Sequence, residues 1–215
     1  MLLMNFRELV VEALRHGFAV GHGAVPEVRA TARELGWTEM PTRVGEGPVS
    51  VLTPRTPEQA PPRSMSALFG LAAQPLHTDG AHTTNPPDYI VLVADRPSST
   101  PTLVWTASLS ARWLPTFASH GVFLVDSGRD AFFATAVREG AVVAYDPGCM
   151  TPCDQRARQT ADYFAAPTGV AKQIAWSDPG QVLLIDNRHA LHARAAVEPN
   201  DLDRQLVRIA YRGAS

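Results

Sequence analysis

The chain has 215 residues, of which 45% are apolar and 19% charged, a composition typical of a globular protein with one substantial core. The formal net charge is −2, and the basic residues are scattered arginines with Lys172 as the only lysine, so nucleic acid is excluded as an expected partner. The first apolar run is too short for a membrane span and is interrupted by Glu8 and Glu12, where a signal peptide needs continuous hydrophobicity. We therefore expect a cytosolic protein without a membrane partner, folded as a single domain over residues 1–215.

Two amphipathic helices are predicted near the N-terminus. Apolar residues recur at helical spacing from Asn5 to about His16, and Gly17 follows as a stop. A second helix is expected from Pro26 to Leu35, because proline suits a first helical position and Gly36 suits the end. These N-terminal helices, over residues 5–36, are expected to pack on a core.

Beyond residues 41–75, which are rich in Pro, Gly and Ser, short β-type runs alternate with turn residues. Many short strands without long helices between them predict an antiparallel sandwich or barrel, with one interrupting helix at about Gln155 to Ala165. The expected strands are Asp88 to Val93, Thr102 to Trp105, Val122 to Val125, Phe132 to Val137, Val142 to Tyr145, Val170 to Ile174, Val182 to Ile185 and Leu206 to Tyr211.

The two cysteines, Cys149 and Cys153, lie in the segment GCMTPCD. No second cysteine pair and no nearby histidine completes a zinc site around them. We expect buried or semi-buried free thiols without a catalytic role.

A candidate metal site begins in the segment QPLHTDGAH, which places His77 and Asp79 two residues apart. On an extended chain both side chains point to the same face and can hold one ion. A third ligand is expected from the segment PGQVLLIDNRHALHAR, as either His189 or His192. Two imidazoles and one carboxylate are the ligands of non-haem iron(II) oxygenases, although a lone His-x-Asp is more often a surface hydrogen-bonding pair.

Two arginines downstream could bind an anion. Arg204 and Arg208 are four apart in DRQLVRIAYR, so on a strand both would face the same side, beside the strand that carries the distal histidine. A guanidinium there can hold a dicarboxylate through two hydrogen bonds. For an isolated pair, solvated charges at a strand edge are the alternative.

Four blocks of sequence together resemble the TauD/TfdA superfamily of Fe(II)/2-oxoglutarate-dependent dioxygenases, most closely its clavaminate synthase-like branch of amino-acid hydroxylases. The blocks are SMSALFG followed by PLHTD, then HTDGAHTTNPPDYIVLVADRPS, then TPTLVWTA, and finally PGQVLLIDNRHALHAR with DRQLVR. The resemblance implies a mainly β fold with flanking helices, the double-stranded β-helix or cupin-like jelly roll, with its core at about residues 61–212.

The resemblance also implies a ligand set for iron(II), namely His77, Asp79 and His192. His192 is favoured over His189 because the family's ligand is followed by a small residue and then arginine, as in the segment HAR. His189 is then a loop residue or a hydrogen-bond donor beside the site, and His82 lines the pocket or packs against it. The carboxylate ligand is Asp, whereas Glu is common in this branch.

By the same resemblance, Thr102 and Arg204 hold the distal carboxylate of 2-oxoglutarate. Arg208 either supports that carboxylate or meets a carboxylate of the substrate. Asp146 and Ser66 correspond to positions that contact the substrate in relatives, with turn or capping roles as the alternative.

The function implied is an oxygenase that uses Fe(II), 2-oxoglutarate and O2 to hydroxylate an unactivated C–H bond. The expected substrate is a small polar metabolite, an amino acid or a derivative made in biosynthesis. An acid at position 79 favours hydroxylation over halogenation, while desaturation or cyclisation with the same cofactors stays open. Two other classes are a zinc-dependent hydrolase or isomerase with the same ligands and an inactive jelly-roll binding module.

Overall fold

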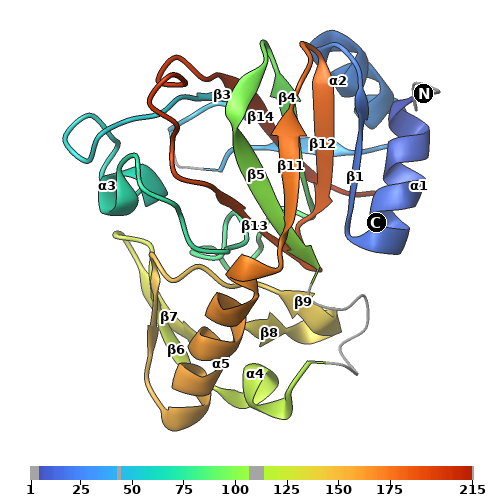
Figure 1. Ribbon diagram of the computed structural model, residues 1–215. Helices are drawn as coiled ribbons and strands as arrows, with labels where there is room; N and C mark the ends of the chain where they lie inside the picture. Colours follow the sequence, from blue (N-terminus) through green and yellow to red (C-terminus); the bar gives the residue numbers. More distant parts are fainter. Residues whose placement is uncertain (1–4, 43–44, 107–113, 215) are drawn as a thin grey trace.

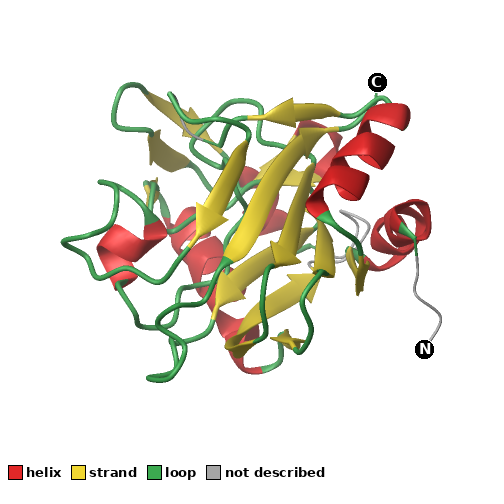
Figure 2. Cartoon of the chain, turned by 90° about the horizontal axis from the view of Figure 1, so that it is seen from above, coloured by secondary structure: helices red, strands yellow, loops and turns green. Residues whose placement is uncertain are grey.

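Two antiparallel β-sheets form the centre of the protein, and helices lie outside them (Figures 1 and 2). The computed structural model describes residues 5–42, 45–106 and 114–214. The larger sheet has the order β1-β12-β4-β14-β2, with β3 also paired to β14, and the smaller sheet has the order β11-β5-β13. The larger sheet contains β1 (Phe18–His22), β2 (Thr38–Met40), β3 (Val49–Leu52), β4 (Tyr89–Ala94), β12 (Gln181–Asp186) and β14 (Leu206–Arg212), and the smaller contains β5 (Ser98–Thr106), β11 (Lys172–Trp176) and β13 (Ala190–Arg194).

Side chains of the central strands alternate between two cores. Ile90 and Leu92 of β4 point into the core between the sheets, whereas Val91 and Val93 point to the opposite face. Because β4 and β12 are buried along their whole length, both faces must be apolar, and the strands read as continuous hydrophobic runs.

Helices α1 (Phe6–His16) and α2 (Val25–Glu34) cover the outer face of the larger sheet. Asn5 caps α1 by a capping box with Glu8, and Gly17 ends the helix in a left-handed conformation with φ of 84°. Both predicted N-terminal helices are confirmed, with ends shifted by one residue. None of the helices in the described ranges combines the length and the hydrophobicity needed to cross a bilayer.

A further group of elements packs against β5 and β13 of the smaller sheet and lies below the two sheets in Figure 1. The predicted helix α5 (Gln155–Ala165) is confirmed, with Asp154 as its N-cap. Phe164 of α5 and Leu191 of β13 belong to the same core cluster. The other elements here are α4 (Thr116–His120), β6 (Phe123–Asp126), β7 (Ala131–Ala134), β8 (Val137–Arg138), β9 (Val142–Val143) and β10 (Met150–Pro152), while α3 (Met65–Phe69) lies between β3 and β4 in sequence.

Several sequence expectations need correction. The strand expected at Phe132 to Val137 is two strands, β7 and β8, that belong to different sheets. The strand expected at Val170 begins only at Lys172, because a 3-10 helix over Ala166–Gly169 precedes it. The strands β1, β2, β3, β10 and β13 were not predicted.

The cysteines are free, as expected, but only one of them is sheltered. Cys149 is half-buried, whereas Cys153 is exposed. The expectation of burial is therefore wrong for Cys153, which directly precedes the N-cap of α5.

Candidate metal centre and anion pocket

A two-residue β-bridge brings the two candidate imidazoles together. The His77 amide donates to the His192 carbonyl over 3.0 Å, and the His192 amide donates to the His77 carbonyl over 2.8 Å. The ring centroids are 4.7 Å apart. His192 lies on β13, so the bridge extends the smaller sheet by one pairing, and the extended segment expected at His77 and Asp79 pairs with the sheet through this bridge alone.

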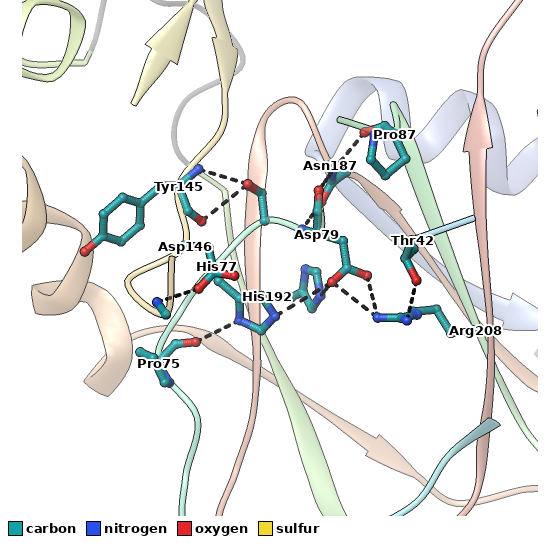
Figure 3. A network of polar contacts seen from close by, with 12 residues as sticks. Thr42, Pro75, His77, Asp79, Pro87, Tyr145, Asp146, Asn187, His192 and Arg208 are labelled. Carbon is teal, nitrogen blue, oxygen red and sulfur yellow. Dashed lines mark hydrogen bonds and ion pairs between the residues drawn. The ribbon is translucent and has the colours of Figure 1, made fainter. Parts of the chain in front are cut away.

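Asp79 completes a compact cluster with the two histidines (Figure 3). Its Oδ1 atom lies 3.9 Å from Nε2 of His77 and 4.0 Å from Nε2 of His192. All three residues are buried, and one ligand atom from each lies within 4.8 Å of the others. The structure thus brings together the three side chains that the sequence predicted as metal ligands.

The orientation and burial of the imidazoles suit metal binding. Nδ1 of His77 lies 2.9 Å from the Pro75 carbonyl, which can only accept, so Nδ1 donates there and Nε2 faces Asp79 Oδ1 over 3.9 Å. Burial, together with the nearby His77, lowers the pKa of His192 to about 3. His192 is therefore neutral at neutral pH, as a ligand must be.

Arg208 lies beside Asp79 instead of standing free in the cavity (Figure 3). Its Nη1 is 3.2 Å from Asp79 Oδ2, its Nη2 donates to Thr42 over 2.6 Å, and its Nε donates to Ser50 over 3.2 Å. Burial alone would raise the pKa of Asp79, but the charge of Arg208 and its hydrogen bond outweigh burial and lower the pKa to about 2. The carboxylate is therefore ionised at neutral pH.

Asn187, which sequence reasoning missed, fixes the main chain of Asp79. Its side-chain oxygen accepts from the Asp79 amide over 2.9 Å, and its amide nitrogen donates to the carbonyls of Asp79 (3.0 Å) and Pro87 (2.8 Å). Asn187 lies in the turn between β12 and β13, so these bonds connect the turn that precedes the His192 strand to Asp79, two residues after His77. The available indication was an Asp-Asn pair directly after a buried strand, a combination typical of turns whose side chains bond to the main chain.

Arg204 is a buried cation that makes no direct ion pair with a described acid. It is 4% exposed, and its Nη2 makes a long hydrogen bond of 3.4 Å to the hydroxyl of Thr102. Its Nε has no hydrogen-bond partner. Burial, reinforced by the nearby Arg194, outweighs the attraction of Asp201 and lowers the pKa of Arg204 to about 10, so it keeps its charge. Such a charge is costly unless an anion joins it.

The arrangement of the two arginines differs from the expectation. Strand β14 begins at Leu206, so Arg204 lies in the preceding turn and the two arginines do not share one strand. Strand β14 belongs to the larger sheet, whereas β13 with His192 belongs to the smaller one. The expectation that the arginine strand lies beside the distal-histidine strand is wrong, because β14 pairs with β4, β2 and β3.

One cavity of about 1030 Å³ collects the predicted residues. His82 also lines it, whereas His189 does not and instead bonds through Nδ1 to Asp186 in the turn before β13. Asp146 accepts a hydrogen bond from the Gly148 amide over 2.7 Å. This bond is typical of a turn, the role expected for Asp146 as the alternative to substrate contact. The predicted site residues on the cavity wall are Ser66, His77, Asp79, Thr102, Asp146, His192, Arg204 and Arg208.

Comparison with solved structures identifies the fold. Asparagine oxygenase in complex with Fe(II), 2S,3S-3-hydroxyasparagine and succinate superimposes with a TM-score of 0.67 at 16% identity, over 97% of this chain and 78% of that one. The non-haem iron oxygenase OrfP, with Fe, succinate and (3S)-hydroxy-L-Arg, superimposes with a TM-score of 0.68 at 18% identity, over 97% and 80%. OrfP in complex with Fe and alpha-ketoglutaric acid superimposes with a TM-score of 0.68 at 18% identity, over 97% of this chain and 79% of that one.

No family model and no curated protein matches the sequence. At 16 to 18% identity, the structural likeness establishes the fold and leaves the chemistry to the residues. The predicted fold class is confirmed: the chain has the jelly-roll fold of these iron oxygenases.

Proposed function

We propose that the protein is an Fe(II)/2-oxoglutarate-dependent oxygenase that hydroxylates an unactivated C–H bond of a small polar metabolite, an amino acid or a derivative. The observation that carries this proposal is the unpaired, buried Arg204 in the same cavity as the cluster of two histidines and an aspartate. A metal cluster alone suits several enzyme classes, including zinc hydrolases. A buried cation that can bind an anion beside the cluster favours the 2-oxoglutarate-dependent oxygenases, because their co-substrate is a dicarboxylate.

His77, Asp79 and His192 would hold iron(II), because two imidazoles and one carboxylate are the donors that such oxygenases use. His192 is neutral, Asp79 is ionised, and Nε2 of His77 faces the same point as they do, so the three donors fit the ion. When bound, the iron and 2-oxoglutarate supply with O2 the oxidising power for C–H hydroxylation, with succinate and carbon dioxide as co-products. Asn187 would keep the Asp79 carboxylate in position.

Arg204 and Thr102 would bind the distal carboxylate of 2-oxoglutarate. The free Nε of Arg204 and its charge support this role, because a carboxylate supplies the missing acceptor and the missing negative charge together. Arg208 has partners on all three guanidinium nitrogens, one of them Asp79, so its charge is already balanced. This difference favours Arg204 over Arg208 as the anchor of the co-substrate.

The substrate would occupy the rest of the cavity. Ser66 of α3 and Asp146 both line it, which supports the polar contacts expected of them. The complexes of asparagine oxygenase and OrfP contain hydroxylated asparagine and arginine, and a cavity of about 1030 Å³ has room for a ligand of that class beside the co-substrate. These observations support a free amino acid or a close derivative as the substrate.

An anaerobic titration with iron(II) and 2-oxoglutarate tests the proposal. We expect a weak visible charge-transfer band with the native protein, its loss in His77→Ala and in Arg204→Ala, and its retention in the matched control Arg96→Ala. Arg96 is on the surface, pairs with Asp203 and does not line the cavity. A native protein that binds iron(II) without developing the band would refute the proposal.

The substrate class is tested separately by succinate formation across a panel of amino acids. We expect at least one amino acid to raise succinate above the uncoupled background, together with a product heavier by one oxygen atom. A panel without any such response would refute the amino-acid assignment and leave the cofactor assignment standing.

A further inference from the structure

Thr102 stands between two hydrogen-bond donors in the wall of the cavity. It is 3% exposed and lies on β5, where its Oγ1 accepts from Arg204 Nη2 (3.4 Å) and from the indole Nε1 of Trp176 (3.1 Å). Trp176 is 1% exposed and follows an irregularity in the pairing of β11 with β5, between Ile174 and Trp176. Irregularities of this kind redirect a side chain, and here the indole N–H points at the Thr102 hydroxyl.

The hydrogen-bonding capacity of the hydroxyl determines which role Thr102 has toward a ligand. A hydroxyl group has two acceptor lone pairs and one hydrogen to donate. An indole N–H and a guanidinium can only donate, so Trp176 and Arg204 together occupy both lone pairs of Thr102. No acceptor in the described part of the chain pairs with the Thr102 hydrogen, which is left for a ligand in the cavity.

We propose that Trp176 determines the selectivity of this subsite for a carboxylate: by occupying Thr102 as an acceptor, it forces the hydroxyl to donate, so that the wall beside Arg204 offers donors only. This inference rests on the proposed function and names a residue that acts through Thr102 without touching the co-substrate. A carboxylate has acceptors on both oxygens and satisfies every donor of such a wall. A primary amide in its place turns an NH2 group toward N–H and O–H donors, and one of those donors stays unpaired.

Trp176→Phe tests this idea because it keeps an aromatic ring and removes the indole N–H. The Thr102 hydroxyl can then rotate and accept, so the preference of the subsite for a carboxylate over an amide narrows. Because Trp176 of β11 is also a residue of the core between the two sheets, loss of packing has to be separated from loss of the hydrogen bond.

A double-mutant cycle makes that separation. Dissociation constants are measured anaerobically by calorimetry with Mn(II) in place of iron, for 2-oxoglutarate and for 2-oxoglutaramate, whose distal group is an amide. The proteins compared are the native chain, Trp176→Phe, Thr102→Val and the double variant. We expect Thr102→Val to weaken 2-oxoglutarate binding by roughly tenfold, the effect of losing one hydrogen bond to a charged group. Trp176→Phe should weaken it less, because its Thr102 hydroxyl can still donate, and both variants should narrow the preference for 2-oxoglutarate over the amide.

The double variant should bind 2-oxoglutarate no more weakly than Thr102→Val, because Trp176 acts through the hydroxyl that this variant lacks. Losses that multiply in the double variant, or an unchanged preference in Trp176→Phe, would overturn the inference. Trp105→Phe is the matched control, since Trp105 is a half-buried tryptophan of β5 that does not line the cavity, and both constants should keep their native values. Failure of the proposed function looks different, because the native protein would then bind neither compound.

Discussion

Removal of the Asn187 side chain should destabilise the protein far more than its small volume suggests. Asn187 is 1% exposed, and Asn187→Ala leaves the Asp79 amide and the carbonyls of Asp79 and Pro87 without their partner. An unsatisfied buried polar group costs about 1–3 kcal/mol, and carbonyls tolerate the loss better than amides. Three such groups sum to about 3–5 kcal/mol, a large share of the roughly 5–15 kcal/mol that stabilises a typical domain.

Urea denaturation followed by circular dichroism measures this loss. The control is Asn200→Ala, since Asn200 is exposed and makes no side-chain hydrogen bond in the structure, and its effect should stay within about 0.5 kcal/mol. Co(II) affinity of the folded Asn187→Ala protein should also fall, by roughly tenfold or more, because the carboxylate of Asp79 is no longer held in place. A free energy of unfolding within about 1 kcal/mol of the native value would show that these hydrogen bonds do not hold Asp79.

Two further measurements follow from burial and charge. Cys153 is exposed, whereas Cys149 is half-buried and burial raises the pKa of its thiol, so one thiol should react quickly with a disulfide reagent and the second only on unfolding; two fast thiols would contradict the structure. Burial alone would raise the pKa of Asp186, but hydrogen bonds from His189 and Arg188 outweigh it and lower the pKa. The stability that the ionised Asp186 contributes should therefore be complete above about pH 4 and decline as the pH falls further. Urea unfolding of the native protein and of Asp186→Asn at pH 7 and pH 3 checks this, and a constant difference between the two proteins would contradict it.

Local sequence patterns predicted the helices and strands that form because of their own residues and not because of a partner strand that is distant in the sequence. Helices α1, α2 and α5 have helical spacing and end signals, and the central strand β4 is apolar throughout. Strand β13 (Ala190–Arg194) was missed because its sequence ALHAR is short and half polar, and it becomes a strand by pairing with β5. The same pairing, with β11 on the other side, extends β5 to Ser98–Thr106, well beyond the predicted Thr102 to Trp105. Such boundaries depend on partners that are distant in the sequence.

The site shows the same division. A candidate metal-binding pair two residues apart is visible in the sequence, and the third candidate ligand, His192, follows from the family resemblance. The roles of Asn187 and Trp176 are not visible, because their partners lie 108 and 74 positions away. The relation between Arg204 and Arg208 was inferred from a strand that was assumed to cover both, yet β14 begins at Leu206. Both still line the cavity, because Arg204 reaches it from the turn before the strand.

The metal cluster and the wall formed by Arg204 and Thr102 have opposite hydrogen-bonding character, and this contrast determines how the proposed co-substrate is oriented in the cavity. The cluster of His77, Asp79 and His192 offers lone pairs, which attract a cation. The wall formed by Arg204 and Thr102 offers donors, which attract an anion. Because the charge of Arg208 is already balanced by Asp79, Arg204 is the one of these two arginines that can bind the distal carboxylate. A molecule with a chelating oxo acid at one end and a carboxylate at the other therefore has one favoured orientation. Its oxo acid would bind the metal ion held by the cluster, and its other carboxylate would accept hydrogen bonds from Arg204 and Thr102.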